Sequence, residues 1–216
     1  MGELHVNMIT TLDGVIQANG GPTEQDGDFE YAGWERPFWD SESGEQLNAF
    51  VQASDALLLG RTTYDIFRDY WPGQSNEIGR AFNRVPKYVA SRGTPELTWD
   101  VSTQITDAGA EIRDLRERHE QIHTWGSANL LQTLFREALV NQVNLWVCPV
   151  VLGRGKKLFP EGTAATRFEQ VEPPKSFPGG VVLLRYRCLE GPPETGNVAE
   201  AVNAEDQMRT KWARHR

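Results

Sequence analysis

Apolar and polar positions along the chain switch repeatedly between spacings of about two and about 3.6 residues. Leu4, Val6 and Met8 alternate with their neighbours, which predicts an opening strand that ends near residue 11. The wholly apolar run over residues 56–59 is typical of a central strand buried on both faces. The N-terminal part of the chain therefore supplies two strands of one sheet, separated by a long loop and a helix.

The later elements keep the same alternation. Helices are predicted over about 44–54, 62–70, 107–118 and 127–138. Strands are predicted over 87–90, 121–125, 143–152, 167–172 and 181–189. Thr62 and Asp65 have the spacing of a capping box. Alternating strands and helices followed by two closing strands favour an α/β sheet, mostly parallel, with an antiparallel strand near the C-terminus.

The length of 216 residues suits one large domain with an appendage, and we expect a domain over 1–190 and a polar tail over 191–216. Within the tail, a short helix over about 198–212 and disorder are equally open. The sequence shows neither a secretory signal nor an apolar run of roughly 18 residues. We therefore expect a cytoplasmic protein with no membrane partner. Cys148 and Cys188 are expected to be reduced thiols rather than a disulfide.

The net charge of -8 is unevenly distributed. Residues 1–60 carry 11 acids and one base, whereas residues 61–216 carry 19 acids and 21 bases. A nucleic-acid binder would show a dominant basic face, so nucleic acid is not an expected partner. Scattered bases at loop positions favour a small anionic ligand instead.

Two strand-to-helix junctions are the first candidates for binding such a ligand. At Gly60-Arg61-Thr62-Thr63 a buried strand ends and a helix begins. The first amides of a helix lack internal partners and carry the positive end of its dipole, so a phosphate is stabilised there. Arg61 would add a fork of donors. The alternative is an ordinary capped helix with a surface arginine.

The second junction is Gly126-Ser127-Ala128-Asn129-Leu130, where a glycine lets another group approach the backbone before the next helix. Many α/β turns contain Gly-Ser for geometry only, so this junction is ambiguous alone. A third loop, Ser91-Arg92-Gly93, follows another strand. A dinucleotide has separated phosphates and needs several such places. The usual G-x-G-x-x-G fingerprint is absent.

Five blocks of the chain, in order over residues 1 to about 190, resemble the dihydrofolate reductase superfamily, and within it the branch related to the reductase domain of bacterial riboflavin biosynthesis. The blocks are Thr11-Leu12-Asp13-Gly14, residues 59–72 beginning Leu59-Gly60-Arg61, residues 86–92 beginning Pro86-Lys87-Tyr88, Trp125-Gly126-Ser127-Ala128-Asn129-Leu130-Leu131, and residues 149–159 beginning Pro149-Val150-Val151.

The resemblance implies a dihydrofolate-reductase-like three-layer fold, with a mixed, mostly parallel sheet flanked by helices, that binds NADPH along the C-terminal strand ends. It implies a hydride transfer from the nicotinamide to a small heterocyclic or carbonyl substrate. The cofactor would carry out the difficult chemical step, and the protein would position the reactants. The implied cofactor-binding residues are Gly60, Arg61, Thr62 and Thr63 for the pyrophosphate and the 2'-phosphate, Ser91 and Arg92 for the adenosine end, and Gly126, Ser127, Ala128, Asn129 and Leu130 for the pyrophosphate near the nicotinamide.

Asp13 is the implied catalytic residue, donating or relaying a proton or orienting a polar substrate group. The alternative is a turn residue that bonds its own backbone, as an Asp before a Gly often does. The resemblance also makes a homodimer through the late strands plausible, because the predicted strand over 143–152 is long and apolar.

The chain also differs from the family that it resembles. No acid aligns on the first helix where dihydrofolate reductases hold the pterin, so folate is not the expected substrate. The zinc signature of a deaminase is absent. His119 and His123 straddle a helix-to-strand boundary, so no metal site is expected. Trp34, Trp39 and Trp71 either line a substrate cleft or pack in the core. The alternative functions are a nucleotide- or pterin-binding protein without turnover and a protein-interaction module.

Overall fold

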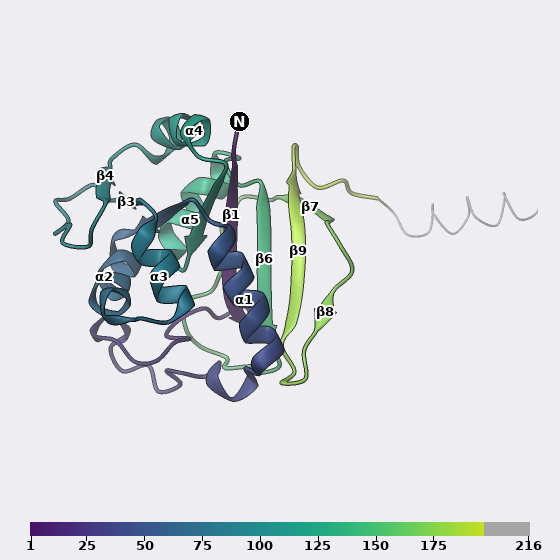
Figure 1. The fold of residues 1–216 in the computed structure, drawn as a ribbon. Coiled ribbons are helices and arrows are strands. Elements are labelled where there is room, and N and C mark those ends of the chain that lie inside the picture. Colours follow the sequence, from purple (N-terminus) through teal and green to yellow (C-terminus); the bar gives the residue numbers. More distant parts are fainter. Residues whose placement is uncertain (197–216) are drawn as a thin grey trace, which may run out of the picture.

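The computed structural model describes residues 1–196, and these residues form one mixed β-sheet with helices on both faces (Figure 1). The strands are β1 (Glu3–Thr11), β2 (Ala56–Gly60), β3 (Lys87–Ala90), β4 (Ser102–Ile105), β5 (Gln121–Trp125), β6 (Gln142–Cys148), β7 (Arg167–Gln170), β8 (Lys175–Ser176) and β9 (Val182–Leu189). Their order is β4-β3-β2-β5-β1-β6-β9-β7, with β8 paired to β9. The first six are parallel and β9 is antiparallel to β6, which confirms the predicted fold class.

Five helices flank this sheet in the described part of the chain. They are α1 (Ser41–Ala53), α2 (Arg61–Tyr70), α3 (Glu77–Arg84), α4 (Ala108–Arg118) and α5 (Ala128–Arg136), with 3-10 turns at Glu24–Asp26, Arg36–Phe38 and Trp71–Gly73. The apolar residues of α4 and α5 share one core cluster. Those of α1, α2 and α3 share a second cluster on the opposite face. The layers are therefore helices, sheet, helices.

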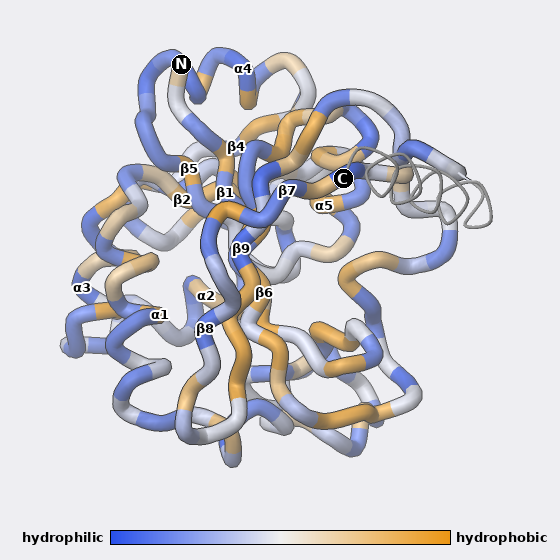
Figure 2. Tube along the Cα trace, turned by 90° about the vertical axis from the view of Figure 1, so that its right-hand side faces the viewer, coloured by the Kyte–Doolittle hydropathy of each residue, from blue (hydrophilic) through white to orange (hydrophobic). Residues whose placement is uncertain are grey.

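Alternation along β1 shows how the two cores are separated. Leu4, Val6 and Met8 are buried beneath α4 and α5, as their spacing predicts. His5 and Asn7 point to the other face and are also buried, so the sheet is covered on both sides. Hydrophobic segments run along β6 and β9 in Figure 2, with hydrophilic segments around them.

Several predicted boundaries were wrong for local reasons. The strand predicted over 143–152 ends at Cys148, because Pro149 follows. The helix α1 begins three residues early, since Asp40 and Ser43 form a capping box. The box predicted at Thr62 and Asp65 does not form.

Instead of capping, the Asp65 carboxylate accepts hydrogen bonds from Arg61 and Arg68. The elements α3, β4 and β8 were not predicted at all. They are short and lie in polar stretches, where periodicity is weak.

The two cysteines are free, as predicted. Burial raises the pKa of each thiol to about 12, so both are neutral. Across residues 1–196, no helix is both long and apolar enough to cross a bilayer. The helix considered for residues 198–212 lies outside the described residues.

Candidate cofactor-binding site

The two strand-to-helix junctions lie side by side at the C-terminal edge of the sheet, because β2 and β5 are neighbouring parallel strands. The Gly60 amide donates to Ser127 Oγ (2.8 Å). The Ser127 amide donates to Thr63 Oγ1 (2.9 Å). Each junction thus supplies one hydroxyl to the other, and the two turns form a single unit.

The second junction has an unusual backbone. Gly126 and Ser127 both have positive φ, at 62° and 65°. A Cβ on Gly126 would lie 2.9 Å from Thr63 Oγ1, so the turn requires glycine for its close approach to α2 as well as for its φ. Ser127 lacks the conformational freedom of glycine. A non-glycine residue with a positive φ is strained, and such strain often occurs at functional turns.

The N-termini of α2 and α5 have no side-chain cap. The other three helices do, from Asp40 on α1, Asn76 on α3 and Asp107 on α4. In α5 the backbone bonds begin where the Leu131 amide donates to Ser127 O (3.0 Å). The three amides before it lack an acceptor within the helix, so they are open to an anion.

The structure changes the part that two predicted residues play. The hydroxyls of Thr63 and Ser127 join the two turns. The Gly60 amide already donates to the Ser127 hydroxyl, and the Ser127 amide already donates to the Thr63 hydroxyl. The donors left for a diphosphate are the amides of residues 61–63 and 128–130. The Leu130 side chain packs in the core, so its only contribution would be its amide.

Arg61 extends from the start of α2 toward the loop after β3. Its Nε donates to Asp65 (2.7 Å) and its Nη1 donates to the carbonyl of Thr94 (3.1 Å). A guanidinium has five N–H groups, and the side chain is half-exposed, so further donors are available. Ser91 and Arg92, which are predicted to bind the adenosine end of the cofactor, belong to this same loop.

In that loop, Arg92 is exposed and forms no ion pair within residues 1–196. Ser91 is half-buried, and its Oγ accepts from the Gly93 amide (3.3 Å). The Gln104 side chain holds the loop against β4 by donating to the carbonyls of Ser91 (2.8 Å) and Gly93 (2.6 Å). The anchored loop thus contains Arg92 and is contacted by the Arg61 guanidinium.

Asp13 lies just past β1 at the same edge of the sheet. Its carboxylate accepts from the Thr11 hydroxyl (2.6 Å) and from the amides of Leu152 (3.2 Å) and Gly153 (2.9 Å). The Thr11 hydrogen bond, ahead of the two amides, holds the pKa of this carboxyl below its usual value. Asp13 is therefore ionised at neutral pH, which favours orienting a group over donating a proton. Its catalytic role stays a prediction.

Sequence reasoning missed Glu35, in the loop between β1 and α1. This half-buried carboxyl accepts from Asn19 Nδ2 (2.9 Å), and burial raises its pKa. Its place between Trp34 and Trp39, inside a strongly acidic loop, was the available signal. Both tryptophans pack in the core, as one of the two readings predicted.

Trp71 also packs in the core, against Phe67 and Phe82. His5, on the central strand β1, is buried and stacks on His123, with ring centroids 5.1 Å apart. Burial lowers the pKa of His123 to about 3, so that ring is neutral. No group of metal-ligating side chains occurs among the described residues.

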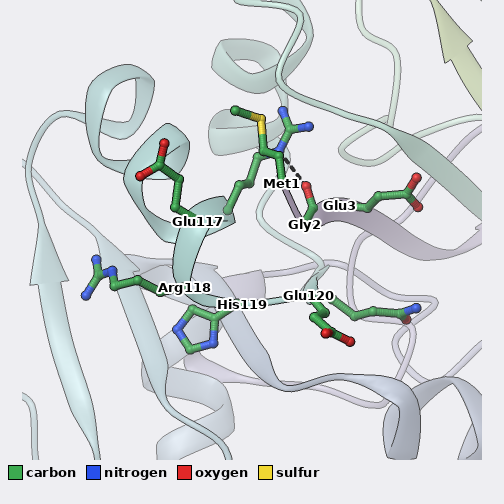
Figure 3. Close-up of a pocket in the computed structure, with 9 residues that line it drawn as sticks. Met1, Gly2, Glu3, Glu117, Arg118, His119 and Glu120 are labelled. Carbon is green, nitrogen blue, oxygen red and sulfur yellow. Dashed lines mark hydrogen bonds between the residues drawn. The ribbon is translucent and has the colours of Figure 1, made fainter.

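A polar pocket lies at the opposite edge of the sheet, where β1 and β5 begin. Residues 1–3 and 116–121 line it. Figure 3 shows Glu117, Arg118 and Glu120 pointing in different directions, and the Arg116 side chain is taken up by a hydrogen bond to the Gly2 carbonyl (2.8 Å). The pocket is separated from the joined turns by the full length of the strands.

The sheet order and the helices on both faces define a protein of the dihydrofolate-reductase-like fold class. The chain belongs to the RibD C-terminal domain family, a family of reductases, whose model matches residues 3–181. The resemblance seen in the sequence is thereby confirmed.

Similar proteins cover nearly the same length. The chain is 26% identical to the uncharacterized protein YyaP of Bacillus subtilis, over 84% of this chain and 92% of that one. It is 28% identical to the uncharacterized protein YwjB of the same organism, over 82% and 92%.

Solved structures support the fold. A putative riboflavin biosynthesis protein from Shewanella sp. PV-4 has a TM-score of 0.63 at 18% identity, with 87% of this chain and 99% of that chain covered. A pyrimidine reductase-like protein from Corynebacterium diphtheriae has a TM-score of 0.58 at 14% identity, over 88% and 93%. RibD from Acinetobacter baumannii has a TM-score of 0.60 at 14% identity, over 88% of this chain and 58% of that one.

Proposed function

We propose that the protein is an NADPH-dependent reductase that transfers a hydride to a small heterocyclic or carbonyl substrate. The observation that carries this proposal is the pair of adjacent, uncapped helix N-termini on α2 and α5, in a chain of a reductase family. Helix N-termini bind phosphate through free amides and the helix dipole. Two of them side by side offer more donors than one phosphate uses, as a diphosphate requires.

Each part of the site then has a distinct task. The amides of residues 61–63 and 128–130 would hold the diphosphate, and Arg61 with Arg92 would hold the 2'-phosphate. When bound, NADPH supplies the hydride. Asp13 would orient a polar group of the substrate, since its carboxylate is ionised and is fixed by three donors.

The cofactor can be tested without knowing the substrate. We expect saturable NADPH binding below millimolar concentration by calorimetry, and weaker binding of NADH, which lacks the 2'-phosphate. Equal binding of the two cofactors would contradict the role of Arg61 and Arg92. No saturable binding of NADPH would overturn the assignment.

Turnover is tested by NADPH consumption with panels of pterins, pyrimidine ribosides and carbonyl compounds. The Asp13 carboxylate already accepts three hydrogen bonds from the protein itself. This favours a second candidate function, a nucleotide- or pterin-binding protein without turnover. Tight cofactor binding with no consumption of NADPH across all three panels would support that candidate. A cytoplasmic location, where both thiols stay reduced, belongs to the proposal.

A homodimer through the late strands is also part of the proposal, but it would not use the edge of β6. That strand is paired on both sides, by β1 and β9. The available surface includes Phe159 and Phe168, which are exposed and in ring contact with each other. We expect Phe168→Glu to convert a dimer to a monomer in sedimentation velocity, and a wild-type monomer would refute this arrangement.

A further inference from the structure

Glu35 is the feature that the proposed function leaves unused. It lies in the loop over residues 12–40, which runs along the lower edge of the sheet in Figure 1, where β1 ends. Asn19 Nδ2 donates to Glu35 Oε2 (2.9 Å). The Trp39 indole is close enough to lower the pKa of the carboxyl slightly, although its buried N–H has no well-formed hydrogen bond. The carboxyl is therefore held in place by neutral groups alone.

The surroundings of Glu35 contain no compensating positive charge. Burial is the main influence on its pKa and raises it, and Asn19 and Trp39 offset only part of this. No lysine, arginine or histidine within residues 1–196 forms an ion pair with it. On β6, the buried Cys148 shares a core cluster with Trp34, the neighbour of Glu35, and burial raises the pKa of its thiol, which keeps it neutral. Glu35 is thus an isolated carboxyl.

Its segment of the loop lies against the end of β6, next to the proposed cofactor site. Trp34, the residue before Glu35, shares a core cluster with Cys148, and Trp39 packs on Trp146 with ring centroids 5.6 Å apart. Cys148 is the last residue of β6 and pairs in register with Thr11 at the end of β1. The next strand beyond β1 is β5, which leads into the open amides of α5. Two strand spacings, about 10 Å, separate β6 from β5. A ribose and a nicotinamide ring extend over such a distance from a diphosphate.

We propose that Glu35 stands at the nicotinamide end of the site and gives the substrate its proton. This rests on the proposed function. As hydride reaches the carbon of the C=N or C=O group, the π-electron pair moves to the nitrogen or oxygen. That atom takes the proton of the Glu35 carboxyl, and the carboxylate regains a proton from water. Asp13 and Glu35 then have different roles, one orienting as a carboxylate and the other donating as an acid.

The position of Glu35 can be tested with the two redox forms of the cofactor as probes. The nicotinamide ring is positively charged in NADP⁺ and neutral in NADPH. A carboxylate beside the ring therefore strengthens NADP⁺ binding selectively, and NADP⁺ binding favours loss of the Glu35 proton. Because both forms carry the same phosphates, the ratio of their affinities cancels the titration of the 2'-phosphate. Asp13 does not interfere, since its lowered pKa lies below the range studied.

The experiment measures both dissociation constants by calorimetry between pH 4.5 and 8, for wild type, Glu35→Gln and the control Glu24→Gln. Glu24 is an exposed acid of the same loop, so its substitution removes the same charge. We expect wild-type affinity for NADP⁺ relative to NADPH to rise with pH, and this rise to be absent in Glu35→Gln. At pH 8 the variant should bind NADP⁺ about five- to tenfold more weakly, with NADPH affinity unchanged.

The outcomes separate the two proposals. If wild type binds NADPH but its NADP⁺ preference is independent of pH, Glu35 does not face the nicotinamide and the inference is wrong, whatever the variant does. The inference is equally wrong if Glu35→Gln and Glu24→Gln behave alike. If wild type binds neither form, the proposed function fails, and the inference that rests on it is overturned with it.

Discussion

The N-termini of the five helices fall into two groups. Those of α1, α3 and α4 are closed by the side chains of Asp40, Asn76 and Asp107. Those of α2 and α5 are open, and they are the two that begin at the joined turns. A cap contributes about 1 kcal/mol to stability, so leaving two helices uncapped has a cost. The difference is explained if a ligand, and not a side chain, completes α2 and α5.

Ser127 makes the contrast sharper, because serine is among the best capping residues. It occupies the cap position of α5, yet its hydroxyl accepts from the Gly60 amide on the neighbouring turn. The side chain that would close α5 is therefore used to hold the two open N-termini together. A pair of turns built only for stability would cap each helix separately.

The largest effect is expected at the joint between the two open N-termini. Gly126→Ala adds a Cβ 2.9 Å from Thr63 Oγ1 at a φ of 62°. We expect a loss of about 2 kcal/mol or more of unfolding free energy and at least about tenfold weaker NADPH binding. Gly44→Ala in α1 is the control, because nothing lies within 4 Å of the added atom.

In urea unfolding the control should gain about 0.5–1 kcal/mol, since alanine is the better helix former, and it should bind NADPH normally. Similar behaviour of the two variants would show that the joint at Gly126 has no special geometry.

Removing the arginine beside the open N-terminus of α2 is expected to act on one cofactor. Arg61→Ala should weaken NADPH binding about tenfold and leave NADH binding nearly unchanged, because the guanidinium would contact the 2'-phosphate. Arg68→Ala is the matched control, since Arg68 also donates to Asp65 (2.9 Å). Calorimetry with both cofactors makes the comparison, and equal losses for NADPH and NADH would refute the assignment.

A charge added to an open helix start should affect binding and stability in opposite directions. Asn129 is an exposed residue in the first turn of α5. Asn129→Asp should weaken NADPH binding about fivefold by repelling the diphosphate. The melting temperature should stay the same or rise, because an acid suits a helix N-terminus. Ala110→Asp in the first turn of the capped α4 should leave binding unchanged. Equal effects on NADPH would contradict the distinction between the two groups.

Removing a cap should affect stability alone. The Asp107 side chain accepts from the Ala110 amide (3.1 Å). Asp107→Ala should lower the unfolding free energy by about 1 kcal/mol, measured in urea, and leave NADPH affinity unchanged. A change in affinity would mean that α4 communicates with the site.

The smallest effect concerns acid stability at Asp13. Its folded pKa is lowered, so its stabilising contribution is present above the unfolded pKa and is lost as pH falls through the folded value. Asp13→Asn should therefore reduce the dependence of melting temperature on pH below about 4. An unchanged acid profile would show that the contacts of Asp13 with Thr11 and the loop after β6 do not matter to stability.

The fold was largely predictable because strands such as β1 and β2 have strong, simple apolar patterns. The helix α3 was not predictable from periodicity, because it has only eight residues and owes its start to the Asn76 cap. The end of β6 depended on a single proline. Short elements are fixed by caps and tertiary packing, which a pattern of hydrophobic residues does not describe.

The candidate site was predictable in position but not in detail. Glycines and hydroxyl residues at strand ends indicated both junctions, and parallel strands bring such ends to one edge. That Ser127 would bond Gly60 rather than cap its own helix depends on contacts 67 residues apart in the chain. Glu35 was missed because its pKa is set by burial, which the sequence of an acidic loop does not reveal.

The most direct test is an amide NMR titration of the wild-type protein with NADPH, which reports on each helix start at once. The account predicts saturable shifts at the amides of residues 61–63 and 128–130, with the capped starts at residues 77–79 and 108–110 unmoved. Shifts concentrated at the capped helices, or at the pocket around residues 116–121, would contradict it.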